Sequence, residues 1–298
     1  MLEKYLDRII LGDCIEILRA IPSDSIDMCF ADPPFNLKKK YNSYKDKLQD
    51  EEYLAWSKIW IEELVRVTKP TGSIFIHNIP RWLIYFAAIL NEKAYFRHWI
   101  AWDAMSNPVG KTLLPAHYGI LFYTKSQKNF KFYEIRMPHK RCRVCNSYLK
   151  DYGGKKEQMH PFGPLVSDVW TDIHRIRHNV RRDKHPCQLP IHLLERIVLM
   201  TTDPGDVVLD PFLGTGTTAI AAKALGRHYI GIEIDPFYKK IAEEKLANIT
   251  PSLYKGYYVS FYLGNIQTIR DIEAGAMFPS QLTSTEKRPC DNKSCQSI

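Results

Sequence analysis

Rigid residues and hydrogen-bond acceptors meet in the turn Asp32-Pro33-Pro34-Phe35, which directly follows the apolar run Ile26 to Ala31. Each proline has a fixed φ angle and no N–H group, so the neighbouring acceptors are held in place. The carboxylate of Asp32 and the carbonyl of Pro33 can accept hydrogen bonds from an exocyclic NH2 group, and Phe35 can stack on the ring that carries it. We therefore predict that Asp32, Pro33, Pro34 and Phe35 are catalytic residues that hold a nucleobase by its amine.

A second candidate site lies in Asp210 to Thr218, where a buried run is followed by the glycines of a G-x-G turn. Glycines allow close approach of a ligand to the backbone, and a following helix offers free amides. The third glycine of the dinucleotide pattern is absent, because Thr218 or Ala219 occupies its place. Asp210 would repel a pyrophosphate but would pair well with an ammonium group.

The next apolar run ends in Gly231-Ile232-Glu233-Ile234-Asp235. A carboxylate at this point suits two ribose hydroxyls, although a strand-end capping role would explain Glu233 taken alone. The ligand indicated by both segments has an ammonium group and a ribose but no phosphate. S-adenosylmethionine fits this description better than a nicotinamide dinucleotide does.

The two candidate sites together indicate methyl transfer to an amine. The lone pair of an adenine or cytosine amine is delocalised into the ring, so the nitrogen is a poor nucleophile. Two acceptors draw it toward tetrahedral geometry, which allows direct in-line attack on a sulfonium methyl without a covalent enzyme intermediate. Phe35 would stack on a base that has flipped out of the duplex.

Alternating strand and helix patterns must position these residues, which predicts an α/β fold with a doubly wound, mostly parallel sheet. Apolar runs and short strands are expected at 8–11, 26–31, 73–77, 98–102, 118–123, 206–210, 228–234 and 257–263. Helices are expected at 14–20, 50–67, 81–90, from Pro190 onward, after Gly214 and at 236–248. The stretch 126–185 is polar, basic and rich in turn residues, which indicates an insertion.

Composition limits the class of protein. The chain has 298 residues, of which 45% are hydrophobic and 25% charged, as expected for one large domain or a domain with an insertion. The first eight residues include four charged ones and no signal-like pattern, and no apolar run approaches the ~20 residues of a membrane helix. Seven scattered cysteines are not typical of a disulfide framework. We expect a cytoplasmic protein with no membrane partner.

The net charge is +8, and the excess is concentrated in one stretch. Residues 136–186 contain twelve lysines and arginines against five acidic residues. Such a stretch is typical of a surface that contacts a phosphate backbone, although a solvated basic face is the alternative on charge alone. The candidate contacts to DNA phosphates or guanine bases are Arg175, Arg177, Arg181 and Arg182.

Two cysteine patterns are similar to motifs of other chemistries. Cys142 and Cys145 have the spacing of zinc ligands, but two further ligands would be needed, so we expect ordinary thiols and no metal. Pro186-Cys187-Gln188 is similar to the nucleophile motif of cytosine-C5 methyltransferases. It lacks the preceding glycines and follows no buried run, so cytosine-C5 chemistry is not favoured.

With these motifs the chain resembles the amino-group DNA methyltransferases of bacterial restriction–modification systems, specific for adenine-N6 or cytosine-N4. Gly12-Asp13-Cys14 and His185 to Pro190 also match motifs of this family. The catalytic motif comes first along the chain and the cofactor loop last, which is similar to the circularly permuted β group. The catalytic motif of the family more often ends in Tyr than in Phe. Phe35 keeps the aromatic face for stacking and lacks only the hydroxyl. The resemblance implies S-adenosyl-L-methionine as cofactor, bound by Asp13, Cys14, Asp32, Lys184, His185, Pro186, Asp210, Phe212, Gly214, Gly216, Thr217 and Glu233.

The resemblance also implies a domain organisation. Residues 1–125 would form the catalytic half of a Rossmann-like methyltransferase domain and 184–278 its cofactor-binding half. Residues 126–183 would be a target-recognition insertion, and 279–298 a disordered tail.

The expected substrate is double-stranded DNA, with adenine favoured because Asp in the first motif position is commoner among adenine enzymes. Cytosine-N4 methylation is the nearest alternative. RNA or protein-amide methylation and a non-catalytic DNA-binding subunit are further alternatives. The resemblance is compatible with a cognate restriction endonuclease as partner. It is also compatible with a homodimer.

Overall fold

The structure is a computed structural model that describes residues 2–37, 47–103, 113–137, 153–155, 158, 163–176, 188–249 and 267–268. The chain divides into two compact units. One comprises Met1–Phe132 and Asp168–Ser252, and the other Tyr133–Ser167 and Leu253–Ile298.

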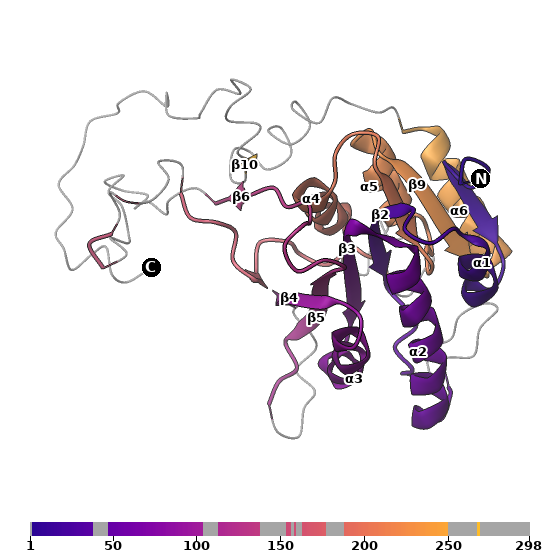
Figure 1. Ribbon diagram of the computed structural model, residues 1–298, viewed down its shortest axis with the longest axis horizontal. Helices are drawn as coiled ribbons and strands as arrows, with labels where there is room; N and C mark the ends of the chain where they lie inside the picture. Colours follow the sequence, from indigo (N-terminus) through magenta and orange to yellow (C-terminus); the bar gives the residue numbers. More distant parts are fainter. Residues whose placement is uncertain are drawn as a thin grey trace. The chain divides into compact units, whose positions relative to one another are not determined.

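An eight-stranded mixed sheet forms the centre of the first unit (Figure 1). Most neighbouring strands are parallel, whereas β5 runs antiparallel to both of its neighbours, β3 and β4. The strands in spatial order are β1 (Arg8–Leu11), β9 (His228–Glu233), β8 (Val207–Asp210), β2 (Ile26–Ala31), β3 (Thr68–Asn78), β5 (His117–Thr124), β4 (Tyr95–Asp103) and β7 (Val169–Trp170).

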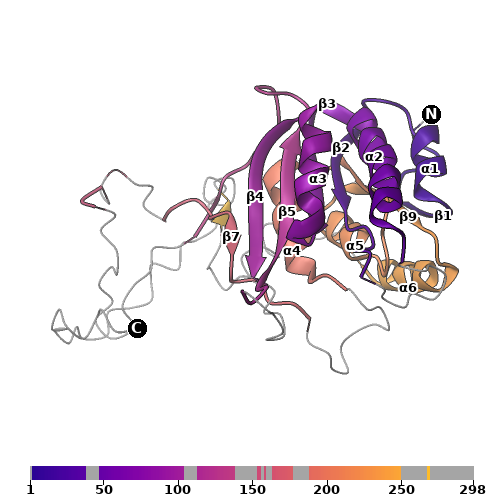
Figure 2. The same cartoon turned by 90° about the horizontal axis from the view of Figure 1, so that it is seen from below.

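Helices cover the sheet in two groups. Helices α1 (Cys14–Ala20), α2 (Asp50–Val67) and α3 (Pro80–Asn91) pack side by side over the strands in Figure 2. Helices α4 (Ile191–Thr201), α5 (Thr217–Ala224) and α6 (Pro236–Ala247) pack against one another as a second group. The strand order advances from β1 through β2 to β3 but reverses from β8 to β9, and right-handed crossovers then place the two groups on opposite faces. The predicted doubly wound, mostly parallel sheet is confirmed.

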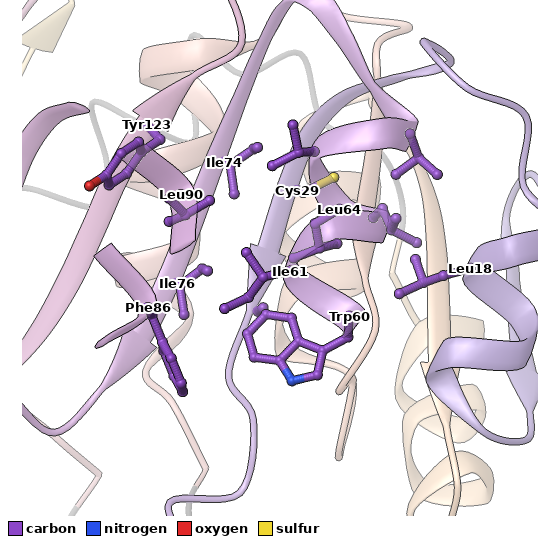
Figure 3. Packing of buried hydrophobic residues seen from close by; sticks show 14 of the residues in the cluster. Leu18, Cys29, Trp60, Ile61, Leu64, Ile74, Ile76, Phe86, Leu90 and Tyr123 are labelled. Atoms are coloured by element: carbon purple, nitrogen blue, oxygen red, sulfur yellow. The ribbon is translucent and has the colours of Figure 1, made fainter. Parts of the chain in front are cut away.

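The hydrophobic core lies between the sheet and the first group of helices (Figure 3). The sheet contributes Cys29, Ile74, Ile76 and Tyr123, and the helices contribute Leu18, Trp60, Ile61, Leu64, Phe86 and Leu90. All six residues of β2 are buried, because helices cover both faces of this central strand. The Asp32-Pro33-Pro34-Phe35 turn therefore follows a fully buried strand.

Several element boundaries differ from those predicted. Strand β3 was expected to begin at Ser73 but begins at Thr68, directly after α2, because Thr68 pairs with Ile26 before the register shifts. Strand β7 lies within the segment expected as an insertion, yet it joins the main sheet, where Trp170 is buried and pairs with Trp102. The predicted strand 257–263 and the predicted tail 279–298 lie outside the described residues.

The described part of the second unit contains two short strands. Strand β6 (Ile135–Arg136) pairs antiparallel with β10 (Gln267–Thr268), and Arg136 forms an isolated bridge with Leu165. Among all described helices of the chain, none is long and apolar enough to cross a membrane.

Candidate active site

A cavity of about 160 Å³ opens where the carboxyl ends of β1, β9, β8 and β2 meet. Parallel strands end at the same edge of a sheet, and the loops that follow them gather there. Most of the predicted site residues that the structure describes line this cavity, namely Asp13, Cys14, Asp32, Pro33, Pro34, Phe35, Asp210, Phe212, Gly214, Thr217 and Glu233. Residues separated by some two hundred positions thus share one site.

Side chains of α2 and α3 hold the Asp-Pro-Pro-Phe turn in place. The hydroxyl of Tyr53 donates to the carbonyl of Pro34 at 2.5 Å, and the indole N–H of Trp82 donates to the carbonyl of Phe35 at 2.8 Å. Asn36, with φ at 54°, closes the turn through two hydrogen bonds of 2.9 Å between its side chain and the backbone of Leu48. The turn is therefore preorganised by groups outside it.

Asp32 has a partner that sequence reasoning did not identify. Its Oδ1 lies 2.7 Å from Nδ1 of His77, and the side chain of Asp32 is 14% exposed. Strand pairing explains the contact, because Ala31 and Ile76 are register partners in β2 and β3 and the next pair is Asp32 and His77. Only the register of two strands 45 residues apart could have indicated this pair.

Phe35 belongs to an aromatic cluster beside the turn. Its ring centroid lies 5.5 Å from that of His77 and 5.7 Å from that of Tyr118, and the residue is 4% exposed. His77 also contacts the ring of Trp102 at 5.6 Å. The ring predicted to stack on a base is thus held by packing rather than projecting freely.

Asp210 is buried at the end of β8. Its carboxylate accepts the amide N–H of Phe212 at 2.9 Å and the hydroxyl of Thr218 at 2.5 Å. Burial raises the pKa of Asp210 to about 7 against the opposing effect of these two donors, and the charges of Asp32 and Glu233 raise it further. A cation in the cavity would favour the ionised form.

Glu233 ties the glycine loop to the end of β9. One carboxylate oxygen accepts the amide of Gly214 at 2.7 Å, and the other accepts the amide of Asp235 at 2.8 Å. Burial raises the pKa of Glu233 above its ordinary value despite these hydrogen bonds. Each carboxylate oxygen has a further lone pair, so hydroxyl donors can still be accepted.

Among the predicted cofactor residues that the structure describes, Gly216 alone does not line the cavity. Its φ of 91° suits glycine, and a Cβ built there would lie 2.8 Å from Cβ of Ala242 in α6. The close packing of α5 on α6 therefore explains why this position is a glycine. Its predicted contact with the cofactor stays a prediction.

Asp13 and Cys14 begin α1 at the rim of the cavity. The carboxylate of Asp13 caps the helix by accepting the amides of Ile15 at 2.9 Å and Glu16 at 3.2 Å. Burial raises the pKa of Cys14 to about 12, so the thiol is protonated near neutral pH. Cys14 can pack against a ligand but is not activated as a nucleophile.

Other predicted residues lie away from the cavity or outside the described residues. Arg175 is half-buried and does not line it. Outside the description are Cys142, Cys145, Arg177, Arg181, Arg182, Lys184, His185, Pro186 and Cys187. Within the described part of the chain, no group of three or more His, Cys, Asp or Glu could hold a metal ion.

Several lining residues were not singled out individually as site residues. They are Gly12, Trp56, Gln188, Leu189, Pro211, Leu213, Thr215, Thr218, Ile232, Ile234, Asp235 and Tyr238. All of them except Trp56 and Tyr238 lie within the predicted motifs, so the motifs themselves were the available signal. Trp56 of α2 contacts the ring of Phe212, with a distance of 5.6 Å between the ring centroids.

The family model N6_N4_Mtase, described as DNA methylase, matches residues 26–244. The chain therefore belongs to this family of amino-group DNA methylases. It is 43% identical to Type II methyltransferase M.BamHI of Bacillus amyloliquefaciens over 82% of this chain, and spans 57% of that protein's length. It is 37% identical to Type II methyltransferase M.HpaI of Haemophilus parainfluenzae over 80% of this chain and 74% of the relative.

Solved structures agree with the fold. TTHA0409 of Thermus thermophilus, a DNA modification methylase by name, has been solved in complex with S-adenosyl-L-methionine. It matches with a TM-score of 0.56 over 83% of this chain and 97% of that chain, at 24% sequence identity. The match supports a Rossmann-like methyltransferase fold.

Proposed function

We propose that this protein transfers a methyl group from S-adenosyl-L-methionine to an exocyclic amine of a base in duplex DNA, with adenine N6 as the first candidate. One observation carries the proposal: the Asp32 turn and the Asp210–Glu233 loops open on the same cavity. Family membership and the Type II relatives support the same reaction class.

The cavity fits the proposed cofactor at both ends. Asp210 offers a buried carboxylate to an ammonium group, and Glu233 offers acceptors to ribose hydroxyls. Apolar walls from Phe212 and Cys14 suit a purine ring. When bound, S-adenosyl-L-methionine supplies a sulfonium methyl group that is open to attack by a nucleophile.

The residues of the turn are suited to activating an amine. The carbonyls of Pro34 and Phe35 are occupied by Tyr53 and Trp82, whereas no described residue donates to the carbonyl of Pro33. Asp32 and the Pro33 carbonyl are therefore left to accept the two N–H groups of the amine. Fixed acceptors of this kind would localise the nitrogen lone pair without forming a covalent bond to the enzyme.

Cytosine N4 is the second candidate base. Both adenine and cytosine present an NH2 group on a flat ring, and the acceptors at Asp32 and Pro33 suit either. Adenine is placed first because Asp rather than Ser begins the catalytic motif. Methylation at cytosine C5 is disfavoured, because Pro186-Cys187-Gln188 lacks the glycines that precede the C5 nucleophile motif and follows no buried run.

Residues 126–183 are proposed to read the DNA, with Arg175, Arg177, Arg181 and Arg182 contacting phosphates or guanine. The excess of basic residues in this stretch supports the proposal. A cognate restriction endonuclease is a proposed partner, in line with the Type II relatives. A second copy of the chain is a further proposed partner. A protein acting on cellular DNA in this way would work in the bacterial cytoplasm.

The experiment is methyl transfer from isotopically labelled S-adenosyl-L-methionine by the purified protein. Unmethylated duplex DNA, RNA and an unrelated protein compete as acceptors, and mass spectrometry of the digested DNA identifies the base. We expect label in DNA as N6-methyladenine, and N4-methylcytosine would select the second candidate. Label in RNA or protein alone, or as 5-methylcytosine, would contradict the proposal.

A further inference from the structure

We propose that His77 is a positioning residue that holds the Asp32 carboxylate for the incoming amine. The inference rests on the proposed function and adds a residue of β3 that lies outside every motif considered above. It names the group that fixes the one carboxylate expected to touch the base.

The contact between the two side chains is short and sheltered. Nδ1 of His77 lies 2.7 Å from Oδ1 of Asp32, and the exposed fractions of the two side chains are 3% and 14%. The pairing of Ala31 with Ile76 fixes both backbones, because each residue is the next one along its strand. A hydrogen bond in so little water is stronger than one at the surface.

The chemistry of the pair determines which atom carries the proton. An ionised carboxylate can only accept, so Nδ1 of His77 must be the donor. Nε2 is buried and has no hydrogen-bond partner among the described residues. If the proton of the neutral ring is on Nδ1, the buried Nε2 carries only a lone pair. Burying this lone pair costs less than burying an unpaired N–H group or a second charge.

The surroundings of the ring keep it in this orientation. Its centroid lies 5.5 Å from Phe35, 5.3 Å from Tyr118 and 5.6 Å from Trp102. Rings packed on several sides restrict rotation of the imidazole. The same imidazole therefore supports both groups that would face the base, the carboxylate of Asp32 and the ring of Phe35.

The two oxygens of Asp32 consequently have different tasks. Oδ1 is engaged by His77, which leaves Oδ2 and the carbonyl of Pro33 for the amine. Without the imidazole, the carboxylate could rotate toward solvent and lose its orientation before the base arrives. At metal sites, loss of a group that orients a ligand in this way typically lowers activity by ~10–100-fold, and we expect a loss of the same order here.

Three substitutions separate positioning from general support of the fold. His77→Asn keeps an N–H near the place of Nδ1, His77→Gln moves it to the place of Nε2, and His77→Leu removes it. The readouts are the single-turnover rate of methyl transfer to unmethylated duplex DNA, the affinities for S-adenosyl-L-methionine and DNA, and the thermal midpoint.

We expect the transfer rate of His77→Asn to stay within ~10-fold of wild type, and those of His77→Gln and His77→Leu to fall by ~10–100-fold. Both affinities should remain within a few-fold of wild type. Equal rates in the Asn and Gln variants, or losses that follow only the thermal midpoint, would overturn the inference. Wild-type protein that methylates no DNA would instead contradict the proposed function, and the role of His77 would be rejected with it.

Discussion

Among the five carboxylates that line the cavity, Asp32, Asp210 and Glu233 are each held by a different kind of donor. Asp32 is held by an imidazole, Asp210 by a hydroxyl and an amide, and Glu233 by two backbone amides. Burial opposes ionisation of Asp210 and Glu233, so their pKa values are raised. A ligand that carries a positive charge and hydroxyl donors would offset this unfavourable clustering.

The titration of Asp210 gives a prediction about stability. Burial raises its pKa from the ordinary value of 3.8 to about 7 in the folded protein. Between these values the folded state binds more protons than the unfolded state, so the free energy of unfolding falls as the pH rises through this window. Asp210→Asn should remove that fall, which is at most ~4 kcal/mol.

Urea unfolding of the ligand-free protein at about pH 5 and about pH 8 measures the effect, because this pH interval includes most of the window. The difference in unfolding free energy between the two pH values should be smaller in Asp210→Asn than in wild type. The Asn side chain can keep the hydrogen bond from the Phe212 amide, which makes it a conservative replacement. The same pH dependence in both proteins would contradict the raised pKa.

Among the secondary-structure elements, the glycine loop links β8 to α5 and is held in place from two sides. The Glu233 carboxylate binds the amide of Gly214 from the end of β9. On the other side, Gly216 begins α5 where the helix meets Ala242 of α6. The shape of the loop thus depends on a strand and a helix that follow it in the sequence.

Gly216→Ala tests this close packing. The substitution introduces a Cβ at a φ of 91° and at 2.8 Å from Cβ of Ala242, so it combines backbone strain with a steric clash. We expect a loss of ~2–4 kcal/mol in the free energy of unfolding, measured by chemical denaturation.

Gly226→Ala is the matched control for Gly216→Ala. Gly226 also has a positive φ, 74°, but a Cβ there would meet nothing within 4 Å. It should therefore lose only the ~1–2 kcal/mol of backbone strain. Equal losses in the two variants would mean that the packing of α5 on α6 does not require a glycine.

How much the sequence could predict depends on the range of the interaction. The apolar run 26–31 and the turn after it carry a local signal, and the structure shows the predicted buried strand followed by turn residues that line the cavity. The contact of His77 with Asp32 depends on the register between β2 and β3, which no local pattern encodes. Similarly, the spacing of Tyr53 predicts a core position of α2, and only the fold shows its hydroxyl at the carbonyl of Pro34.

In the chain as a whole, the predicted catalytic half and the predicted cofactor-binding half contribute strands to one sheet. Strands β2 and β8 pair in parallel, with Met28 opposite Val208, although about 180 residues separate them. The Asp27 carboxylate strengthens this junction by accepting the amide of Val207 at 3.0 Å and the ammonium of Lys69 at 2.7 Å. The order of the motifs along the chain therefore does not prevent them from forming one site.

The basic stretch gives a prediction about DNA binding. Replacing Arg175, Arg177, Arg181 and Arg182 by Gln should lower the salt dependence of DNA affinity, because each lost phosphate contact reduces the slope of log K against log [salt] by ~0.9. Binding to unmethylated duplex DNA at several NaCl concentrations measures the slope. Affinity for S-adenosyl-L-methionine should not change.

A charge change elsewhere provides the control for the arginine variant. Lys240 lies on α6, and its side chain is 75% exposed. Lys240→Gln should leave the salt slope close to that of wild type. If the arginine variant keeps the wild-type slope as well, the stretch is a solvated basic surface and not the DNA-binding face.

The proposed reaction depends above all on the Asp32 carboxylate, and methylation of duplex DNA by Asp32→Ala beside wild type tests it, with the product identified by mass spectrometry. We predict a methylated exocyclic amine with wild type and no detectable product with Asp32→Ala. Affinity of the variant for S-adenosyl-L-methionine, measured by calorimetry, should stay within a few-fold of wild type. Wild-type levels of methylated amine from Asp32→Ala would contradict the proposed role of this carboxylate and the reaction built on it.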